Sequence, residues 1–457
     1  MAAGDSGLKA AIAVTRFGLG ARPGEIEDAR SDPRAWLEAQ IRRGGADQPQ
    51  GAAPFPSTGE GLAELQQYRD EIKQAGADPA MRKQALQPLK LEVVDEALAR
   101  AQLGATTPAG FRERWSLFWA NHFTVSAKNV QMVTAVGPFE REAIRPHVFG
   151  RFQDLLLAST RHPGMLLYLD QAQSLGPDSM AAARRGAGGL NENLAREILE
   201  LHTLGADAGY TQADVTEFAR ALTGWSMGGP KAVDGERGVY VYRAAMHEPG
   251  ARSMLGRRYD GAGEDQALSI LVSLANDPRT SRRIARKLAV HFVADAPPPA
   301  LVERLDGAWR RSGGDLAAVA QALIEAPEAW NPQARKFKTP YEFLISSFRA
   351  AGAAPRDGMR DIAQPLTALG QRPYSPAQPN GWSDQAADWA APDAIVKRLA
   401  WAQAFARTYA PAGDPVQTAL AALGARLTDP VRQAVARAES RPEALAILLM
   451  SPEFQRR

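Results

Sequence analysis

The segment NENLAREILELHTLG, residues 191–205, carries more ionisable side chains than a helix packed against a core requires. On a helix of about 3.6 residues per turn, Asn193, Glu197 and Glu200 lie on one side, and the apolar side chains form a separate stripe. Two carboxylates one turn apart repel each other, which raises the pKa of one of them and can create an acid–base pair. Glycoside hydrolysis uses two such carboxyl groups, so the spacing indicates hydrolytic chemistry.

A plainer interpretation is that this segment is a structural helix with a polar face. Arg196 precedes Glu200 by one turn and can satisfy its charge. If the carboxylates are buried for function, unpaired charge is costly, and Arg196 or Arg220 is expected to pair with Glu197, Glu200 or Asp170.

A metal site is the second chemical alternative. His122, Glu197, Glu200 and His247 are ligand types for iron, manganese or zinc, and helical bundles host such sites. The di-iron signature places Glu and His three residues apart, whereas Glu197 and His202 are separated by five, so the spacing weakens this alternative. The histidines outside any motif are expected to be structural or surface residues: His147, His162 and His291.

The elements that must position these residues are predicted to be helices. Apolar residues recur at three- and four-residue steps in 90–103, 111–123, 211–225, 264–277, 281–294, 316–326, 341–353 and 393–410. Thr211 and Asp214 resemble a capping box at the start of one of them. Only residues 236–256 alternate briefly, which favours at most a small β-hairpin. We therefore expect a mainly α, large multi-helix globular fold, with Gly- and Pro-rich loops at 174–189, 228–238 and 371–385.

Length and composition set further bounds. The 457 residues favour a single large helical domain over 1–457, or two packed halves at about 1–235 and 260–457. A net charge of +3 without a dense basic face argues against nucleic-acid binding, and no phosphate-loop motif supports nucleotide binding. No apolar run approaches the roughly 20 residues of a membrane-spanning helix. No signal peptide is evident, which leaves the cytoplasm, or the periplasm after processing or co-export.

Seven stretches in order along nearly the whole chain resemble the bacterial family catalogued as domain of unknown function 1800. They are RFGLGARP (16–23), WANHFTVS (119–126), LLYLD (166–170), the 191–205 segment, YTQADVTEFARALTGW (210–225), FKTPYEF (337–343) and LLMSPEF (448–454). The resemblance carries its motifs onto Trp119, His122, Asp170, Asn193, Arg196, Glu197, Glu200, Arg220, Trp225, His247, Trp382 and Trp389. In one motif, Glu248 and Arg252 replace the usual Asp and Lys.

The resemblance implies no settled activity for the chain. Genes of that family often lie beside those of a second family with a sulfatase-like or phosphatase-like fold, which implies a sulfatase-like or phosphatase-like partner and a role at the cell envelope. We predict a hydrolase acting on a carbohydrate or other envelope polymer. Its predicted catalytic residues are Glu197, Glu200, His122, His247 and Asp170, and its predicted substrate-binding residues are Asn193, Arg196, Arg220, Trp225 and Trp382. The alternatives are a divalent-metal enzyme with a His/Glu site and a non-catalytic scaffold or chaperone for the partner.

Overall fold

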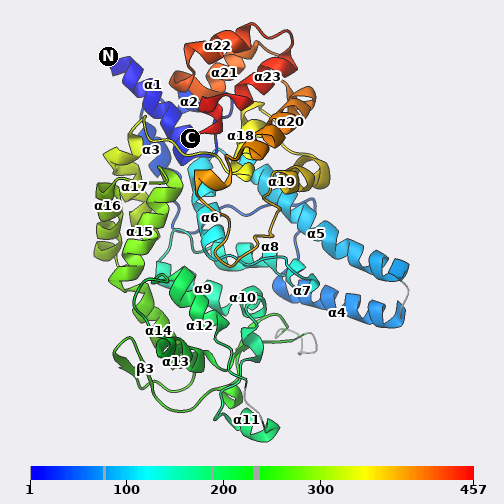
Figure 1. Cartoon of the computed structure of the whole chain (residues 1–457), viewed down its shortest axis with the longest axis vertical. Helices are drawn as coiled ribbons and strands as arrows, with labels where there is room; N and C mark the ends of the chain where they lie inside the picture. Colours follow the sequence, from blue (N-terminus) through cyan, green and yellow to red (C-terminus); the bar gives the residue numbers. More distant parts are fainter. Residues whose placement is uncertain (1, 76–78, 187–188, 230–236) are drawn as a thin grey trace.

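The computed structural model describes residues 2–75, 79–186, 189–229 and 237–457. Parts of the predicted loops at 174–189 and 228–238 therefore lie outside the described residues. The molecule is long and mainly helical, and both ends of the chain lie near one end of it (Figure 1). The predicted mainly α fold is confirmed. None of the helices in the described ranges is both long and apolar enough to cross a bilayer.

The end of the molecule that holds both chain termini is built mostly from the C-terminal third of the sequence (Figure 1). Its helices are α1 (Ala2–Ile12), α2 (Glu25–Asp28), α18 (Pro340–Ala350), α19 (Gln364–Ala368), α20 (Pro392–Tyr409), α21 (Pro415–Leu423), α22 (Asp429–Ala436), α23 (Arg441–Met450) and α24 (Pro452–Gln455). Most of these helices surround a core of their own that includes Phe343, Phe348 and Leu449.

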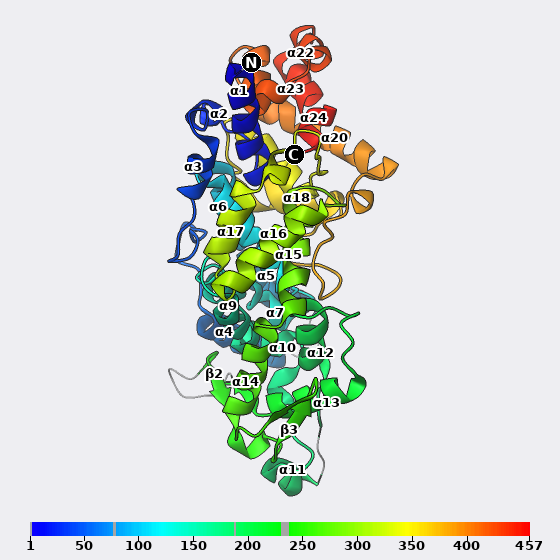
Figure 2. The same cartoon turned by 90° about the vertical axis from the view of Figure 1, so that its left-hand side faces the viewer.

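The middle of the molecule contains the central helix α6 (Gly110–His122) with α15 (Pro278–Phe292) beside it (Figures 1 and 2). Around them lie α3 (Pro33–Glu38), α7 (Val130–Val133), α8 (Val136–Pro138), α16 (Pro299–Ser312) and α17 (Leu316–Glu325). The long helices α4 (Thr58–Ala75) and α5 (Pro79–Thr106) project sideways from this region. Aromatic side chains of α6 and α15 meet here, with the rings of Trp115 and Phe292 5.9 Å apart.

The opposite end carries the segment with the crowded carboxylates. It contains α9 (Phe152–Arg161), α10 (Pro163–Tyr168), α11 (Met180–Arg185), α12 (Asn193–Glu197), α13 (Gln212–Leu222) and α14 (Glu264–Ala275) (Figure 1). Two small antiparallel sheets lie here: β1 (Trp225–Met227) pairs with β2 (Tyr240–Tyr242), and β3 (Arg252–Met254) pairs with β4 (Arg257–Tyr259). Met254 and Tyr259 belong to the same core as Trp115, so packing continues through the region between the two proposed halves.

Short π- and 3-10-helical turns connect several of these helices. The π turns are η1 (Ala13–Phe17), η2 (Phe139–Ile144), η4 (Ile198–His202) and η7 (Gly358–Ala363). The 3-10 turns are η3 (Gln171–Gln173), η5 (Ala244–Met246), η6 (Pro327–Trp330), η8 (Ala386–Asp388) and η9 (Gly424–Arg426). The predicted helix over 191–205 is thus α12 followed directly by η4. Single π turns inside helices occur frequently at functional sites.

Candidate functional site

The outer face of α12 carries a network of ion pairs. Arg196 lies between two carboxylates: its guanidinium is 3.2 Å from Glu192 and 3.6 Å from Glu200. The expected pairing of Arg196 with Glu200 is therefore present. Burial and a hydrogen bond with Glu200 raise the pKa of Tyr210 to about 12. Glu200 thus has a cation, Arg196, and a phenol, Tyr210, as its partners.

Glu197 has a different environment, although it lies only one turn from Glu200. Its side chain is half-buried. Burial first, and the neighbouring Glu200 second, raise the pKa of Glu197, and Arg196 offsets only part of this shift. The Tyr168 hydroxyl is close enough that Glu197 adds to the effect of burial in raising its pKa. Glu197 on α12 and Glu200 on η4 are therefore neighbouring carboxyl groups with unlike environments: the pKa of Glu197 is raised, and Glu200 is paired with Arg196.

Asp170 follows Tyr168 on a segment that is tied to the start of α12. The Asn191 side-chain amide donates to the Leu169 carbonyl at 2.9 Å. Asp170 is exposed and has a left-handed backbone with φ 57°, which few residues other than glycine adopt and which recurs at functional sites. Asn193 is also exposed, at the first turn of α12. The structure brings the predicted Tyr-Leu-Asp and central-helix motifs together.

His122 lies on the inner side of the same segment, beneath η4. Its Nε2 is 3.1 Å from the carbonyl oxygen of His202, which can only accept, so Nε2 carries the proton. The other ring nitrogen, Nδ1, then accepts from the Lys287 ammonium at 3.0 Å. Burial, followed by the nearby Lys287 and Arg283 cations, holds the pKa of His122 well below its usual value. His122 is a neutral, fully oriented imidazole.

Sequence reasoning missed a row of basic residues on α15. Arg283, Lys287 and His291 are spaced by four residues and so share one face of the helix, a signal that the printed sequence contains. Burial, with Arg283 adding to it and Asp384 opposing it, lowers the pKa of Lys287 to about 7. His291 was expected to be an ordinary structural or surface residue. It is buried, and its Nδ1 lies 2.8 Å from Asp384.

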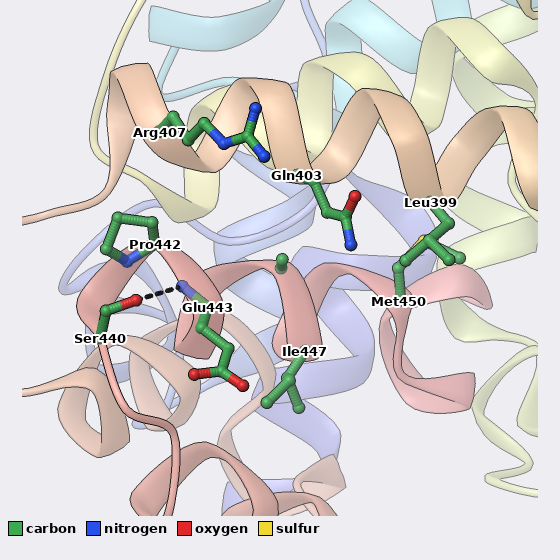
Figure 3. Close-up of a pocket in the computed structure, with 9 residues that line it drawn as sticks. Leu399, Gln403, Arg407, Ser440, Pro442, Glu443, Ile447 and Met450 are labelled. Carbon is green, nitrogen blue, oxygen red and sulfur yellow. Dashed lines mark hydrogen bonds between the residues drawn. The ribbon is translucent and has the colours of Figure 1, made fainter.

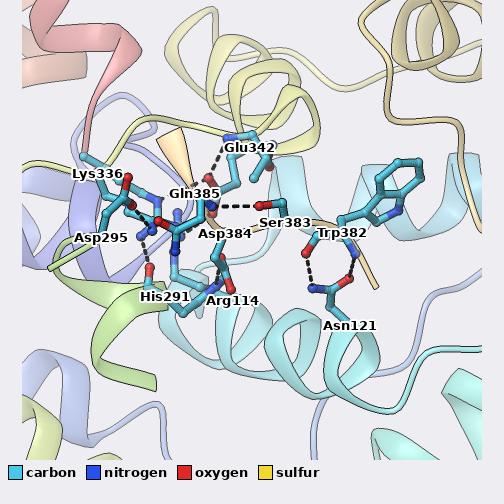
Figure 4. A network of polar contacts seen from close by, with 12 residues as sticks. Arg114, Asn121, His291, Asp295, Lys336, Glu342, Trp382, Ser383, Asp384 and Gln385 are labelled. Atoms are coloured by element: carbon cyan, nitrogen blue, oxygen red, sulfur yellow. Dashed lines mark hydrogen bonds and ion pairs between the residues drawn. The ribbon is translucent and has the colours of Figure 1, made fainter. Parts of the chain in front are cut away.

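The loop over residues 371–391 crosses this region and is fixed by polar contacts (Figure 4). The Asn121 side chain donates to the Trp382 carbonyl at 2.9 Å and accepts from its N–H at 2.7 Å. Asp295 accepts from the Ala386 N–H at 2.8 Å and from the buried Lys336 ammonium. Trp382 is half-buried on this loop. The backbone of Trp382 is therefore held in place by the Asn121 side chain of α6.

His247 and Arg220 belong to a second cluster, at the end of α13. The His247 Nδ1 donates to the Thr223 carbonyl at 2.9 Å, which leaves Nε2 as an acceptor. Arg220 lies 2.7 Å from Glu217 and 3.9 Å from Glu248. Of the two arginines of which at least one was expected to pair with a central carboxylate, Arg196 does so, and Arg220 has these partners instead. The motif that contains Arg220 and Thr223 is therefore in contact with the motif that contains His247 and Glu248.

The two histidines predicted to be catalytic have different partners: His122 contacts η4 and α15, whereas His247 contacts Thr223 and Tyr242. One predicted substrate-binding residue needs correction. Trp225 is 0% exposed, with its ring packed against Tyr240 and Arg161, so it cannot stack on a substrate.

The alternative of a metal site finds no support in the arrangement of the described side chains. In the described part of the chain, no three His, Asp or Glu side chains are grouped so that they could hold a metal ion. Glu200 and His122 are each engaged by other partners, and Lys287 faces His122 where a metal would have to lie. The positive charge of Lys287 beside the His122 Nδ1 would repel a metal cation at that nitrogen.

A surface groove of about 440 Å³ lies elsewhere, between α20 and α23 (Figure 3). Leu399, Gln403, Arg407, Glu443 and Ile447 line it. These residues come from the C-terminal bundle and include none of the predicted catalytic or substrate-binding residues. The groove therefore does not correspond to the predicted site.

Comparisons with known proteins identify a family but no activity. A family model described as "Protein of unknown function (DUF1800)" matches residues 12–456. No curated protein and no solved structure matches the chain.

Proposed function

The chain belongs to the DUF1800 family, whose description assigns no activity, and we propose from its geometry that it is a hydrolase acting on a carbohydrate or other envelope polymer. The observation that carries the proposal is the pair of unlike carboxyl groups at the junction of α12 and η4. Glu197 is half-buried with a raised pKa, and Glu200 is paired with Arg196. Two carboxyl groups with different environments are what acid–base hydrolysis requires.

In this proposal Glu197 is the general acid and Glu200 the general base. Protonated Glu197 gives its proton to the leaving-group oxygen as the scissile bond breaks. Glu200 accepts a proton from the attacking water, whose oxygen forms the new bond. Asp170 and Asn193 are exposed next to this face and can contact substrate. Trp382 is available as a partly exposed aromatic surface on the 371–391 loop.

Assays on a panel of envelope polysaccharides and synthetic glycosides test the proposal. Wild type is compared with Glu197→Gln, Glu200→Gln and the control Glu303→Gln, which alters an exposed carboxylate on α16. We expect turnover by wild type and the control, and a loss of about 100-fold or more in Glu197→Gln and in Glu200→Gln, the size of effect that general acid–base groups produce. Turnover retained in full by both of these variants would remove the two glutamates from the mechanism.

The alternative proposal is a non-catalytic scaffold or chaperone that binds a sulfatase-like or phosphatase-like partner. If no substrate of the panel is turned over, the scaffold role for a sulfatase-like or phosphatase-like partner becomes the better proposal. Co-purification of wild type with the product of the neighbouring gene would then support it. Retained binding by Glu197→Gln would show that association does not use the acid–base pair.

A further inference from the structure

Two basic residues on α15, Arg283 and Lys287, lack the carboxylate partners that most buried cations in the described residues have. Arg145, for example, is paired with Glu113 and Glu140, and Arg349 with Glu25. Within the described residues, neither Arg283 nor Lys287 forms an ion pair with a carboxylate. Arg283 donates to the Leu201 carbonyl at 2.5 Å, and Lys287 donates to His122.

A buried polar atom without a partner lies near these two cations. Arg283 and Lys287 are each partly exposed. His202 is only 2% exposed, and its Nδ1 has no hydrogen-bond partner. A buried ring nitrogen without a partner is costly in a folded protein, which makes a missing ligand a physical explanation for it. Burial, then Arg283 and Lys287, lower the pKa of His202 to about 3, so the ring is neutral.

Arg283, Lys287 and His202 form a cationic corner where α15 meets η4. Gly205, with φ 103°, brings the chain that follows η4 against Arg283, where a Cβ would lie 2.9 Å from the arginine Cδ. On the other side, the carboxylate that lies close enough to affect Lys287 belongs to Asp384, which is already bonded to His291. The corner therefore offers donors and positive charge and little competing negative charge.

We propose that Arg283 and Lys287, together with the nearby unpartnered Nδ1 of His202, bind an oxyanion: a carboxylate, phosphate or sulfate group. A guanidinium and an ammonium four residues apart on one helix face are suited to grip such a group from two sides. The site is distinct from the Glu197–Glu200 pair and does not depend on the proposed hydrolase activity. Its ligand can be a free anion or the charged group of a larger molecule.

Titration calorimetry of the full chain with sodium sulfate, inorganic phosphate and sodium acetate tests this site, against sodium chloride at equal ionic strength. We expect saturable binding of at least one oxyanion. Lys287→Met and Arg283→Gln should each weaken it about tenfold or more, the loss of one charge-assisted hydrogen bond. Arg286→Met is the matched control, because Arg286 is exposed on the same helix, and it should bind like wild type. Stronger binding of acetate than of sulfate or phosphate would identify a carboxylate ligand, and the reverse a phosphate or sulfate.

The pH dependence gives a second readout that a merely structural role would not produce. The groups facing Lys287 are Arg283 and His291 on α15, His122 on α6, His202 on η4 and Asp384 on the 371–391 loop. The histidine pKa values are lowered, so Lys287, with a pKa of about 7, is the group that titrates near neutrality. Sulfate does not titrate there. The affinity of the wild-type protein for sulfate should fall as the pH rises from 6 to 8.5, because Lys287 loses its charge. In Lys287→Met, the affinity for sulfate should change little over the same pH range. Binding absent above the chloride control, or unchanged in both variants, would overturn the proposal.

Discussion

At the scale of a residue, a single buried arginine shows how tightly charge is compensated in this protein. Arg145 is fully buried and makes two 2.8 Å contacts with Glu113 and one of 2.7 Å with Glu140. Arg145→Met would leave Glu113 buried without its cation. We expect a loss of about 3–5 kcal/mol in the free energy of unfolding, measured by urea denaturation.

The double variant Arg145→Met/Glu113→Gln should recover part of that stability, because the uncompensated charge is removed as well. Arg282→Met, on the exposed side of α15, is the control and should stay within about 0.5 kcal/mol of wild type. A similarly small effect of Arg145→Met would contradict the assigned role of the ion pair.

The sequence could predict contacts between neighbouring residues but not those between distant segments. The pairing of Arg196 with Glu200 follows from helical spacing, and it is present. Lys287 and His122 are 165 positions apart, and their contact depends on how α15 packs against α6. No local pattern encodes that packing. The spacing of the basic residues on α15 was visible, but without knowledge of their partners it resembled an ordinary solvated face.

At the scale of an element, the periodic helices were predictable and their interruptions were not. The predicted helices over 111–123 and 211–225 correspond to α6 and α13, and the predicted capping box of Thr211 with Asp214 is present. The helix over 211–225 ends early because Thr223 leaves the helical conformation and Trp225 begins β1. The π turn η4 was missed, because its apolar residues keep a helical pattern while the hydrogen bonding changes.

The 371–391 loop depends on one glycine for its path over α6. Gly381 has φ 78°, and a Cβ at this position would lie 2.5 Å from the Asn121 carbonyl oxygen. Gly381→Ala should therefore break the contacts between Asn121 and Trp382 and cost about 1–3 kcal/mol of stability. Thermal melts measure the loss, and hydrogen exchange should show faster exchange over 371–391.

Gly413→Ala provides the matched glycine control for this test. A Cβ at residue 413 would meet nothing within 4 Å, and the residue has no positive φ. Its substitution should be neutral or slightly stabilising, because alanine reduces the entropy of the unfolded chain. Equal melting temperatures for the two glycine variants would rule out the proposed role of Gly381 in holding the loop.

At the scale of the whole molecule, buried ion pairs join the two hydrophobic cores. Glu342 on α18 contacts Arg114 on α6 at 2.5 Å and Arg457 at 2.8 Å (Figure 4). The core around α6 and the core around α18 are thereby linked through one carboxylate. The helices of each core can be predicted from local periodicity, but such a link between residues 228 positions apart cannot.

The link through Glu342 makes stability depend on pH in a defined direction. Burial alone would raise the pKa of Glu342, but Arg457 and Arg114 hold it far below the usual value. A carboxylate with a depressed pKa stabilises the fold fully above its unfolded pKa of about 4.3, and this contribution is lost as pH falls through lower values. Glu342→Gln should therefore cost about 3–5 kcal/mol at pH 7, since it leaves two buried arginines uncompensated, and less as the pH is lowered below 4. Urea denaturation at pH 7, 5 and 3.5 measures this, with Glu303→Gln as the exposed control. A difference from wild type that stays constant over this range would show that the Glu342 charge does not join the two cores.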